Sequence, residues 1–404
     1  MHVSLFGRLL PLSIALFAVG TDGFVIAGLL PEISRDLGVD IPAAGQLVTA
    51  FALTFALSAP VLGAVTSALD RRATLLVALA VFVIGNAATA LGPSYPVVLA
   101  ARVVTALGAG LIGTAAFSAA AMLAPPERRG RALAFVMGGL TVAMALGLPA
   151  GTLIGAAEWR VTLWVVTGVG LVAAVAVAVF VPVVSLPSDS LRARLRPLRR
   201  PEVLAVLAVT TLALAGTHVV YTYIGPVLHG ATGGSVTALT GVLLAWGLGN
   251  VVGNAAAGYL ADRFEPRRVA LGGLAAAALV LVAGPLVTGG SLAAAIGWAA
   301  VWGVCVSLPV VPQQHRLIAT EPSASAVLLG LNSSAIYLGV ALGGGLGGLV
   351  QPALAPALLE LVGAALSGLG VLLTLVTGRG GVQSGEGDQF TPKRMCAASN
   401  GEPS

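Results

Sequence analysis

Long apolar runs alternate with short polar segments along almost the whole chain. About 20 apolar residues in a helix are enough to cross the roughly 30 Å hydrocarbon core of a bilayer. The runs lack the strict polar and apolar alternation that a transmembrane barrel requires. The pattern therefore predicts an all-α integral membrane protein with twelve transmembrane helices, near residues 9–30, 42–67, 73–92, 96–123, 132–156, 160–183, 203–227, 236–260, 269–288, 291–314, 325–350 and 354–377.

The longest polar connection, SLPSDSLRARLRPLRRPE at residues 185–202, separates the first six runs from the last six. We therefore expect an N-terminal six-helix bundle (1–184), a linker loop (185–202) and a C-terminal six-helix bundle (203–377). The remaining segment (378–404) is polar and without periodicity, which is typical of a disordered tail.

Composition excludes several classes of protein. Of 404 residues, 57% are apolar and 9% are charged, whereas soluble domains carry about 25% charged residues. A water-soluble enzyme, a nucleic-acid-binding protein and a disordered chain are therefore excluded. Two cysteines do not form a disulfide framework.

The basic residues lie almost entirely on one side of the predicted membrane. If the connections alternate between two sides, 18 of the 21 Lys and Arg residues fall on the side of Arg8, two (Arg35 and Arg160) on the other, and Arg102 inside a span. Cytoplasmic loops carry the excess of basic residues in membrane proteins. Both termini are therefore expected in the cytoplasm.

Two landmarks recur at the same offset of 196 residues. Ala145-Leu-Gly147 recurs as Ala341-Leu-Gly343, and the Arg71-Arg72 pair recurs as Arg267-Arg268. The shared offset places the fifth span over the eleventh and predicts two pseudo-symmetric halves. Two such halves around a site at the membrane midplane are typical of secondary transporters.

Four segments resemble the major facilitator superfamily, and within it the twelve-span drug:proton antiporter branch that includes chloramphenicol, sugar and nucleoside exporters. They are GTDGFVIAGLLPEISRDLGV at residues 20–39, the loop GYLADR at 258–263 followed by Arg267-Arg268, Arg102 in the fourth span, and GLPAG at 147–151 followed by Trp159-Arg160. Two positions depart from the pattern: Ser67 stands where the family usually has an acid, and Thr105-Ala106 replace the usual Gln-Gly.

The resemblance implies the major facilitator fold, a multi-pass location in the bacterial cytoplasmic membrane, no enzyme activity and a functional monomer. It implies no cofactor beyond a proton gradient, no metal and no nucleic-acid partner. It also assigns gating to two loops (Gly63, Asp70, Arg71, Arg72, Gly258, Asp262, Arg263, Arg267 and Arg268) and a hinge to the fifth span (Gly147, Pro149 and Gly151). Glycine allows close helix approach and Pro149 removes one backbone hydrogen bond.

Asp22 and Arg102 are the candidate proton-coupling residues. A carboxyl group inside the membrane is costly as an anion and is a functional site by default, so Asp22 can carry a proton. The alternative is a hydrated Asp22 at the outer interface. Arg102 either pairs with Asp22 or snorkels toward the outer face. Glu360, in the first turns of the last span, is expected to anchor that helix at the interface.

Several polar or aromatic residues could line a central substrate cavity together with Asp22. The main candidates are Gln46, His218, Tyr221, Asn250, Asn332 and Tyr337, with Tyr223, Asn254, Gln313 and Gln314 as further ones. Aromatic faces with sparse hydrogen-bonding groups suit a bulky, mostly apolar compound. Each of these side chains could instead form an interhelical hydrogen bond or belong to the interfacial aromatic belt.

The leading hypothesis is export of a small amphipathic compound, such as an antibiotic, in exchange for protons by alternating access. The alternative is a dedicated sugar, nucleoside or metabolite exporter of the same fold. A membrane-embedded enzyme is less favoured because neither H-E-x-x-H nor G-x-S-x-G occurs. A channel is less favoured because of the two-half repeat.

Overall fold

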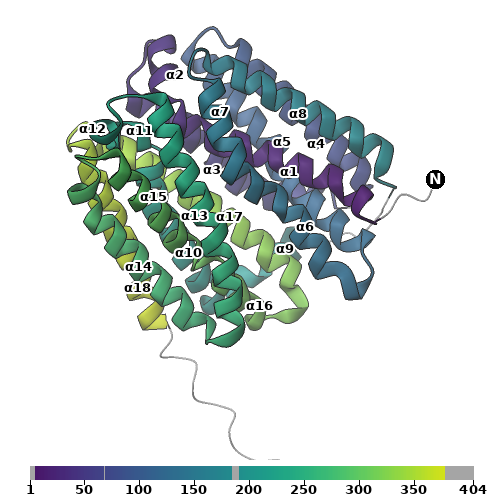
Figure 1. Ribbon diagram of the computed structural model, residues 1–404. Helices are drawn as coiled ribbons and strands as arrows, with labels where there is room; N and C mark the ends of the chain where they lie inside the picture. Colours follow the sequence, from purple (N-terminus) through teal and green to yellow (C-terminus); the bar gives the residue numbers. More distant parts are fainter. Residues whose placement is uncertain (1–4, 68, 184–190, 378–404) are drawn as a thin grey trace, which may run out of the picture.

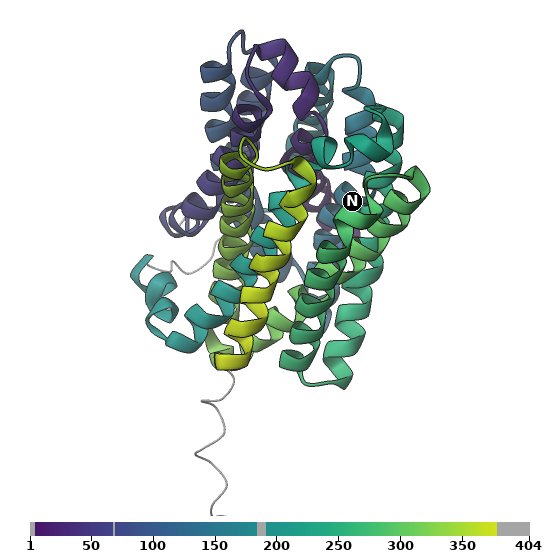
Figure 2. The same ribbon diagram turned by 90° about the vertical axis from the view of Figure 1, so that its left-hand side faces the viewer.

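The computed structural model describes residues 5–67, 69–183 and 191–377, and within these ranges it contains helices and no strand. Twelve of the described segments are long and apolar enough to cross a membrane, which confirms the predicted number of spans. The predicted tail, residues 378–404, and residues 185–190 of the linker lie outside the described residues. Figures 1 and 2 show two groups of roughly parallel helices.

The first bundle contains α1 (Leu5–Gly28), α3 (Ile41–Val65), α4 (Arg71–Leu91), α5 (Tyr95–Leu123), the segment from α6 (Arg129–Val142) to α7 (Leu148–Ile154), and α8 (Trp159–Phe180). The second contains α10 (Pro201–Tyr221), α13 (Val236–Arg263), α14 (Pro266–Val287), the segment from α15 (Leu292–Ser307) to α16 (Val310–Thr320), α17 (Ser325–Val350) and α18 (Leu359–Thr377). Short helices connect them: α2 (Leu30–Leu37), α9 (Leu191–Leu195), α11 (Ile224–Val227) and α12 (His229–Thr232).

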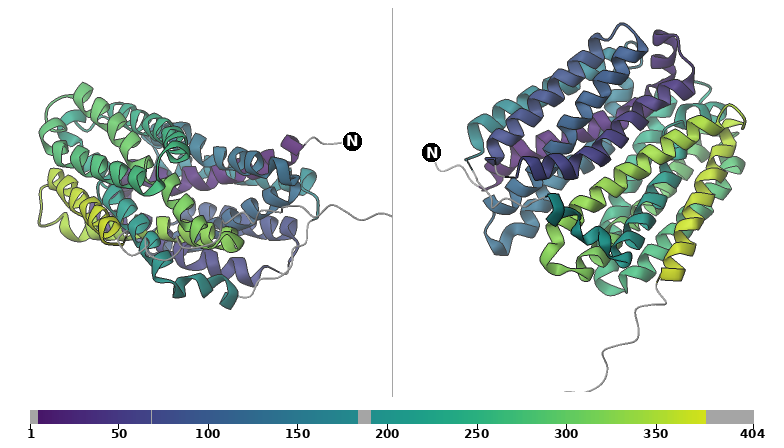
Figure 3. Two further views of the ribbon diagram at one scale, coloured as in Figure 1. Left: turned by 90° about the horizontal axis from the view of Figure 1, so that it is seen from below. Right: turned by 180° about the vertical axis from the view of Figure 1, so that it is seen from behind.

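The bundles are not parallel to each other. We call the face where α1 begins and α18 ends the terminal face, and the face that carries α2, α11 and α12 the opposite face. The ribbons approach each other at the opposite face and diverge toward the terminal face (Figures 1 and 3). Helices α3 and α17, and helices α7 and α13, form the main contacts between the bundles.

The 196-residue repeat is visible in the helices themselves. Helix α10 begins 196 residues after α1, and α17 begins 196 residues after α6. Arg72 donates a hydrogen bond to the carbonyl oxygen of Ala178 at the end of α8. In the second bundle the acceptor is the carbonyl oxygen of Thr374, 196 residues after Ala178, and the donor is Arg267, the first arginine of the repeated pair, whereas Arg72 is the second. The two bundles are therefore pseudo-symmetric.

Three spans are less regular than the hydrophobic runs indicate. In the predicted range 203–227, the long helix α10 ends at Tyr221. Pro226 lacks the N–H group that would continue the helical hydrogen bonds, and the chain forms the short α11 instead. The tenth span breaks between α15 and α16 at Leu308-Pro309. The fifth span contains a π-helical turn, η2 (Ala143–Gly147), which ends two residues before Pro149.

Glycines allow backbones to touch in both bundles. A methyl group added at Gly343 of α17 would lie 2.6 Å from the carbonyl oxygen of Ala215 and 2.8 Å from the backbone nitrogen of Val219 in α10. One added at Gly330, on the same helix, would meet no atom within 4 Å. Close helix approach at small residues is how membrane helices gain packing energy.

We therefore expect Gly343→Ala to lower the free energy of unfolding by about 1–3 kcal/mol, because rigid backbone must move to make room. Gly330→Ala should leave stability unchanged or raise it slightly, since alanine favours helix. Thermal unfolding of the purified protein in detergent measures both. Equal stability of the two variants would contradict the packing described here.

Candidate functional site

Asp22 and Arg102 form an ion pair inside the first bundle. Nη1 of Arg102, on α5, lies 2.7 Å from Oδ1 of Asp22, on α1, and both side chains are 0% exposed. The structure therefore shows the pairing of Arg102 with Asp22, and neither a hydrated Asp22 nor a snorkelling Arg102. Two opposite charges at membrane depth are thus held against each other.

The pair does not satisfy all of its polar atoms. Oδ2 of Asp22, Nε and Nη2 of Arg102 and Oγ1 of the neighbouring Thr21 make no hydrogen bond with any described residue. Thr105, which stands where the family usually has glutamine, donates instead to the carbonyl oxygen of Ala101 at 2.9 Å. A buried polar atom without a partner costs free energy, which marks this pair as a candidate functional site.

Aromatic rings connect this pair to the second bundle. The Arg102 guanidinium lies 4.3 Å from the centre of the Phe51 ring of α3. The ring centroid of Tyr337, on α17, lies 6.4 Å from that of Phe51. The Tyr337 ring also stacks on Phe55, with ring centroids 3.6 Å apart. A methyl group placed on Gly23, the residue after Asp22, would lie 3.9 Å from the Tyr337 hydroxyl oxygen. Contacts therefore run from the ion pair to α17.

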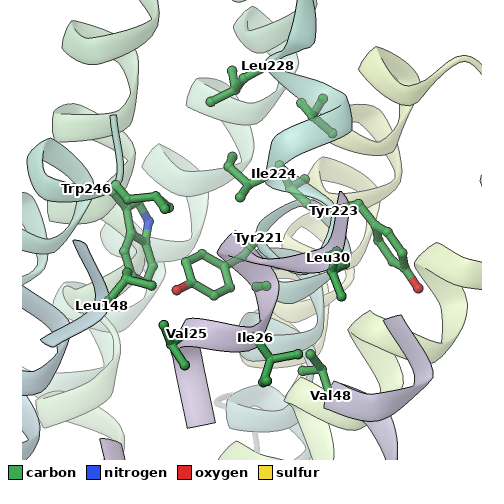
Figure 4. Close-up of a cluster of buried hydrophobic side chains, with 14 of the residues drawn as sticks. Val25, Ile26, Leu30, Val48, Leu148, Tyr221, Tyr223, Ile224, Leu228 and Trp246 are labelled. Atoms are coloured by element: carbon green, nitrogen blue, oxygen red, sulfur yellow. The ribbon is translucent and has the colours of Figure 1, made fainter. Parts of the chain in front are cut away.

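Large side chains from both bundles close the opposite face. Val25, Ile26, Leu30, Val48 and Leu148 of the first bundle pack with Tyr221, Tyr223, Ile224, Leu228 and Trp246 of the second (Figure 4). We call these ten residues the opposite-face seal. The Tyr221 hydroxyl donates to the carbonyl oxygen of Phe24 at 3.2 Å, which joins α10 to α1.

Tyr223 fits between the bundles because three glycines, Gly45, Gly347 and Gly348, face it. A methyl group at Gly45 of α3 or at Gly348 of α17 would collide with the Tyr223 ring or its hydroxyl. The hydroxyl donates to the carbonyl oxygen of Gly344 at 2.9 Å. Glycine at these positions thus allows α3 and α17 to enclose the ring.

His218 occupies the position in α10 that Asp22 occupies in α1, 196 residues earlier. Its Nδ1 lies 2.9 Å from the carbonyl oxygen of Leu214, so Nδ1 carries the hydrogen and Nε2 is an acceptor. Nε2 is buried without a partner among the described residues. The ring lies 6.2 Å from that of Phe24 in the first bundle, so this candidate faces the contact between bundles.

Three of the six remaining cavity candidates, Asn250, Asn332 and Gln313, bond to neighbouring helices. Asn250 accepts from Ser307 at 2.6 Å, and Asn332 accepts from Thr210 at 3.2 Å. Gln313 donates to the carbonyl oxygen of Val206, and Gln46 donates to that of Pro42. Asn254 is exposed and Gln314 is half-buried. The structure thus brings Tyr221, Tyr337 and His218 to the contact between bundles and uses Asn250 and Asn332 to join helices of the second bundle.

The predicted gating loops lie at the terminal face. Asp70 caps α4 by accepting from the backbone N–H of Ala73 at 2.9 Å, and Arg71 donates to the carbonyl oxygen of Ser67. In the other loop, the Arg263 guanidinium lies 4.3 Å from the Tyr259 ring centre. Arg268 pairs with Glu265 at 3.0 Å. Gly63 is buried, whereas Gly258 is half-buried and Asp262 is exposed.

The predicted hinge packs against α1. A methyl group at Gly147 would collide with the Thr21 hydroxyl, and one at Gly151 would lie 2.6 Å from a methyl carbon of Val25. Gly147 ends the π-helical turn and Pro149 follows in the first turn of α7. The segment that carries these residues therefore touches the helix that carries Asp22.

Trp159 and Arg160 hold the opposite-face ends of the first bundle together. Both donate to Oδ2 of Asp36 in α2, Trp159 at 3.0 Å, and Arg160 also donates to the carbonyl oxygen of Gly92 at 3.0 Å. Burial alone would raise the pKa of Asp36, but the hydrogen bonds from Trp159 and Arg160 and the Arg160 charge outweigh it and lower that pKa. Asp36 therefore stays ionised near neutral pH.

The expectation that Glu360 anchors α18 at the interface is wrong. Its side chain is 0% exposed, and Oε1 accepts from the Thr288 hydroxyl at 3.2 Å. Gly284 makes room for it, since a methyl group there would lie 2.5 Å from the carboxyl carbon. The hydrophobic run places Glu360 near a helix end but does not show that it lies on the face that packs against α14.

The sequence patterns did not single out the aromatic partners of these sites. Phe51 and Phe55 lie one turn apart in α3, a spacing that could have indicated a shared face. The ring centroids of Trp246 and Tyr221 lie 4.5 Å apart, and those of Trp302 and Trp246 lie 5.8 Å apart. Among the described residues, no group of three His, Cys, Asp or Glu residues could hold a metal ion.

Two pseudo-symmetric six-helix bundles, one of which holds a buried ion pair linked by aromatic rings to the other, are the architecture of a membrane transporter. The chain belongs to the Major Facilitator Superfamily, whose family model matches residues 12–344. Its relatives are transporters, so it is not an enzyme.

Three relatives share about a third of their residues with this chain. An uncharacterized MFS-type transporter, YbcL, of Bacillus subtilis (strain 168) is 34% identical over 90% of this chain and 93% of its own. The inner membrane transport protein YdhP of Escherichia coli (strain K12) is 33% identical over 92% of this chain and 96% of its own. A chloramphenicol resistance protein of Streptomyces lividans is 35% identical over 72% of this chain and 71% of its own.

The fold is similar to a solved transporter. The xylose transporter XylE from E. coli, in a partially occluded inward open conformation, matches with a TM-score of 0.73. The match covers 96% of this chain and 99% of that one at 14% identity, which shows the fold alone.

Proposed function

We propose that this protein exports a small amphipathic compound in exchange for protons, with Asp22 as the proton carrier. One observation carries the proposal: the fully buried Asp22–Arg102 pair contacts Phe51, which lies beside Tyr337 of the second bundle. A change in the charge of Asp22 therefore acts on a contact between the bundles. Transport by alternating access needs such a link.

The terminal face is assigned to the cytoplasm in this proposal. Of the 18 basic residues that the sequence assigns to the side of Arg8, 15 belong to the described part of the chain, and an excess of basic residues on the cytoplasmic side is what the positive-inside rule expects. The opposite-face seal then closes the outer side, and the bundles diverge toward the cytoplasm. This arrangement corresponds to the inward-facing state of the cycle.

The cycle follows from the chemistry of the pair. In the outward-facing state a proton from outside binds Asp22 and neutralises the carboxylate, which removes its attraction for Arg102. After the bundles rock, the proton leaves to the cytoplasm and the ion pair forms again as the compound binds. One charge moving down 100 mV supplies about 2.3 kcal/mol, which supports roughly a fiftyfold concentration gradient.

Chloramphenicol is the first compound to test. The Streptomyces lividans relative is a chloramphenicol resistance protein, and the rings of Phe51, Phe55 and Tyr337 form an aromatic cluster at the contact between bundles, in which Phe51 and Phe55 are buried. In this proposal the compound reaches their surfaces when the bundles separate. A compound with an aromatic ring and few charges would be recognised mainly by such surfaces.

We expect cells of a pump-deleted bacterium that express this protein to accumulate several-fold less chloramphenicol than cells with an empty vector. A protonophore should abolish the difference, because the proton gradient is the energy source. A panel of other antibiotics, sugars and nucleosides is measured in parallel. Reduced accumulation of sugars or nucleosides alone would favour a dedicated exporter, and no change for any compound would contradict export.

A further inference from the structure

A cavity opens at the terminal face between α1 and α6, far from the site described above. Its volume is about 210 Å³, and it is lined by Leu5, Phe6, Leu9, Arg128, Arg131 and Ala132. The two helices pack side by side there (Figure 1). The cavity thus combines two guanidinium groups with apolar side chains.

The basic side of the cavity has no partner in the described chain. Arg128 and Arg131 are exposed and form no ion pair or hydrogen bond with a described residue. They lie at the first turn of α6, where the helix dipole favours anions and disfavours cations. Glu127, on the turn before them, is exposed as well. An external anion would offset this excess of positive charge.

The apolar side continues toward the surface that faces lipid. Leu9 and Ala132 form a buried floor. Phe6 is 53% exposed and packs edge-on against Phe135 with ring centroids 5.3 Å apart, and Leu10 is 50% exposed. Inorganic phosphate would gain nothing from these side chains, whereas the glycerol and acyl chains of a lipid would cover them.

We propose that this cavity binds the headgroup of an anionic phospholipid. Arg128 and Arg131 hold the phosphate through charge-assisted hydrogen bonds, for which guanidinium geometry is well suited. The acyl chains run along Phe6 and Leu10. The cavity lies on the face with the basic excess, and basic pockets between helices on the cytoplasmic side commonly bind anionic lipids. Bound there, the lipid joins the ends of α1 and α6.

The experiment measures lipid binding and not transport, so its outcome is independent of the proposed export. The full-length protein, stripped of lipid in detergent, is titrated with phosphatidylglycerol, phosphatidylcholine or inorganic phosphate and followed by native mass spectrometry and thermal unfolding. We expect phosphatidylglycerol to bind at least about tenfold more tightly than phosphatidylcholine and to stabilise the protein. Inorganic phosphate should neither stabilise it nor compete.

The variant Arg128→Gln/Arg131→Gln should lose most of this preference for phosphatidylglycerol. Arg196→Gln/Arg199→Gln is the matched control, because it removes the same charge from exposed linker arginines elsewhere on the chain. The proposal is overturned if both double variants lose the preference for phosphatidylglycerol equally. It is also overturned if the wild type binds the two lipids equally, or if inorganic phosphate competes fully with phosphatidylglycerol. The comparison of the two lipids on the wild-type protein tests the proposal even if a double variant fails to fold.

Discussion

Asp22→Asn should abolish uphill efflux while leaving downhill exchange of the compound. Asparagine keeps the size of aspartate and can accept the hydrogen bond from Arg102, but it cannot bind and release a proton. Reconstituted wild-type protein should build a gradient of roughly fiftyfold per 100 mV. The Asp22→Asn variant should build none. Uptake into proteoliposomes with an imposed proton gradient, with chloramphenicol as the first probe, measures this difference.

Asp40→Asn is the matched control for that variant. Asp40 lies on the same bundle, is exposed and caps α3 by accepting from the backbone N–H of Ala43 at 2.8 Å. Asparagine caps helices about as well as aspartate, so transport should be unchanged. Full uphill efflux by Asp22→Asn would show that another group carries the proton.

Removing the charge of Asp22 should destabilise the protein more than removing that of Arg102. In Asp22→Asn the Arg102 guanidinium stays buried without a counter-charge and cannot lose its proton, so we expect a cost of about 3–5 kcal/mol. In Arg102→Met the Asp22 carboxyl can become neutral by binding a proton, so the cost should be smaller. Thermal unfolding of the purified variants measures both.

The double variant Asp22→Asn/Arg102→Met separates folding from coupling. With both charges gone, stability should recover most of the loss seen in Asp22→Asn, since buried ion pairs add little net stability. Uphill efflux should stay absent because no titratable group remains at this position. Additive losses of stability in the double variant would contradict a direct interaction between the two side chains.

The membrane-spanning architecture could be predicted because it depends on local properties. Span length, the sidedness of arginine and the 196-residue offset each need only the order of residues along the chain. The ends of helices depend on single groups, so the early end of α10 before Pro226 and the π-helical turn before Pro149 were not predicted in detail. These local changes leave the number of spans unchanged.

The candidate site depends on which way each side chain points around its helix. Hydropathy gives the depth of Arg102 in the membrane, but pairing or snorkelling is decided by the rotation of α5 relative to α1. For the same reason Glu360 looked interfacial and is buried against α14. The opposite-face seal needs both bundles in place, because Tyr221 and Val25 come from different halves of the chain.

The central claim is that Asp22 releases a proton when the compound binds. The most direct measurement is the proton release that follows addition of the compound to purified protein in a weakly buffered solution with a pH indicator. The account predicts up to one proton released per compound bound by the wild type, falling to none in Asp22→Asn. Binding without proton release at every pH tested, or unchanged release from the variant, would contradict it.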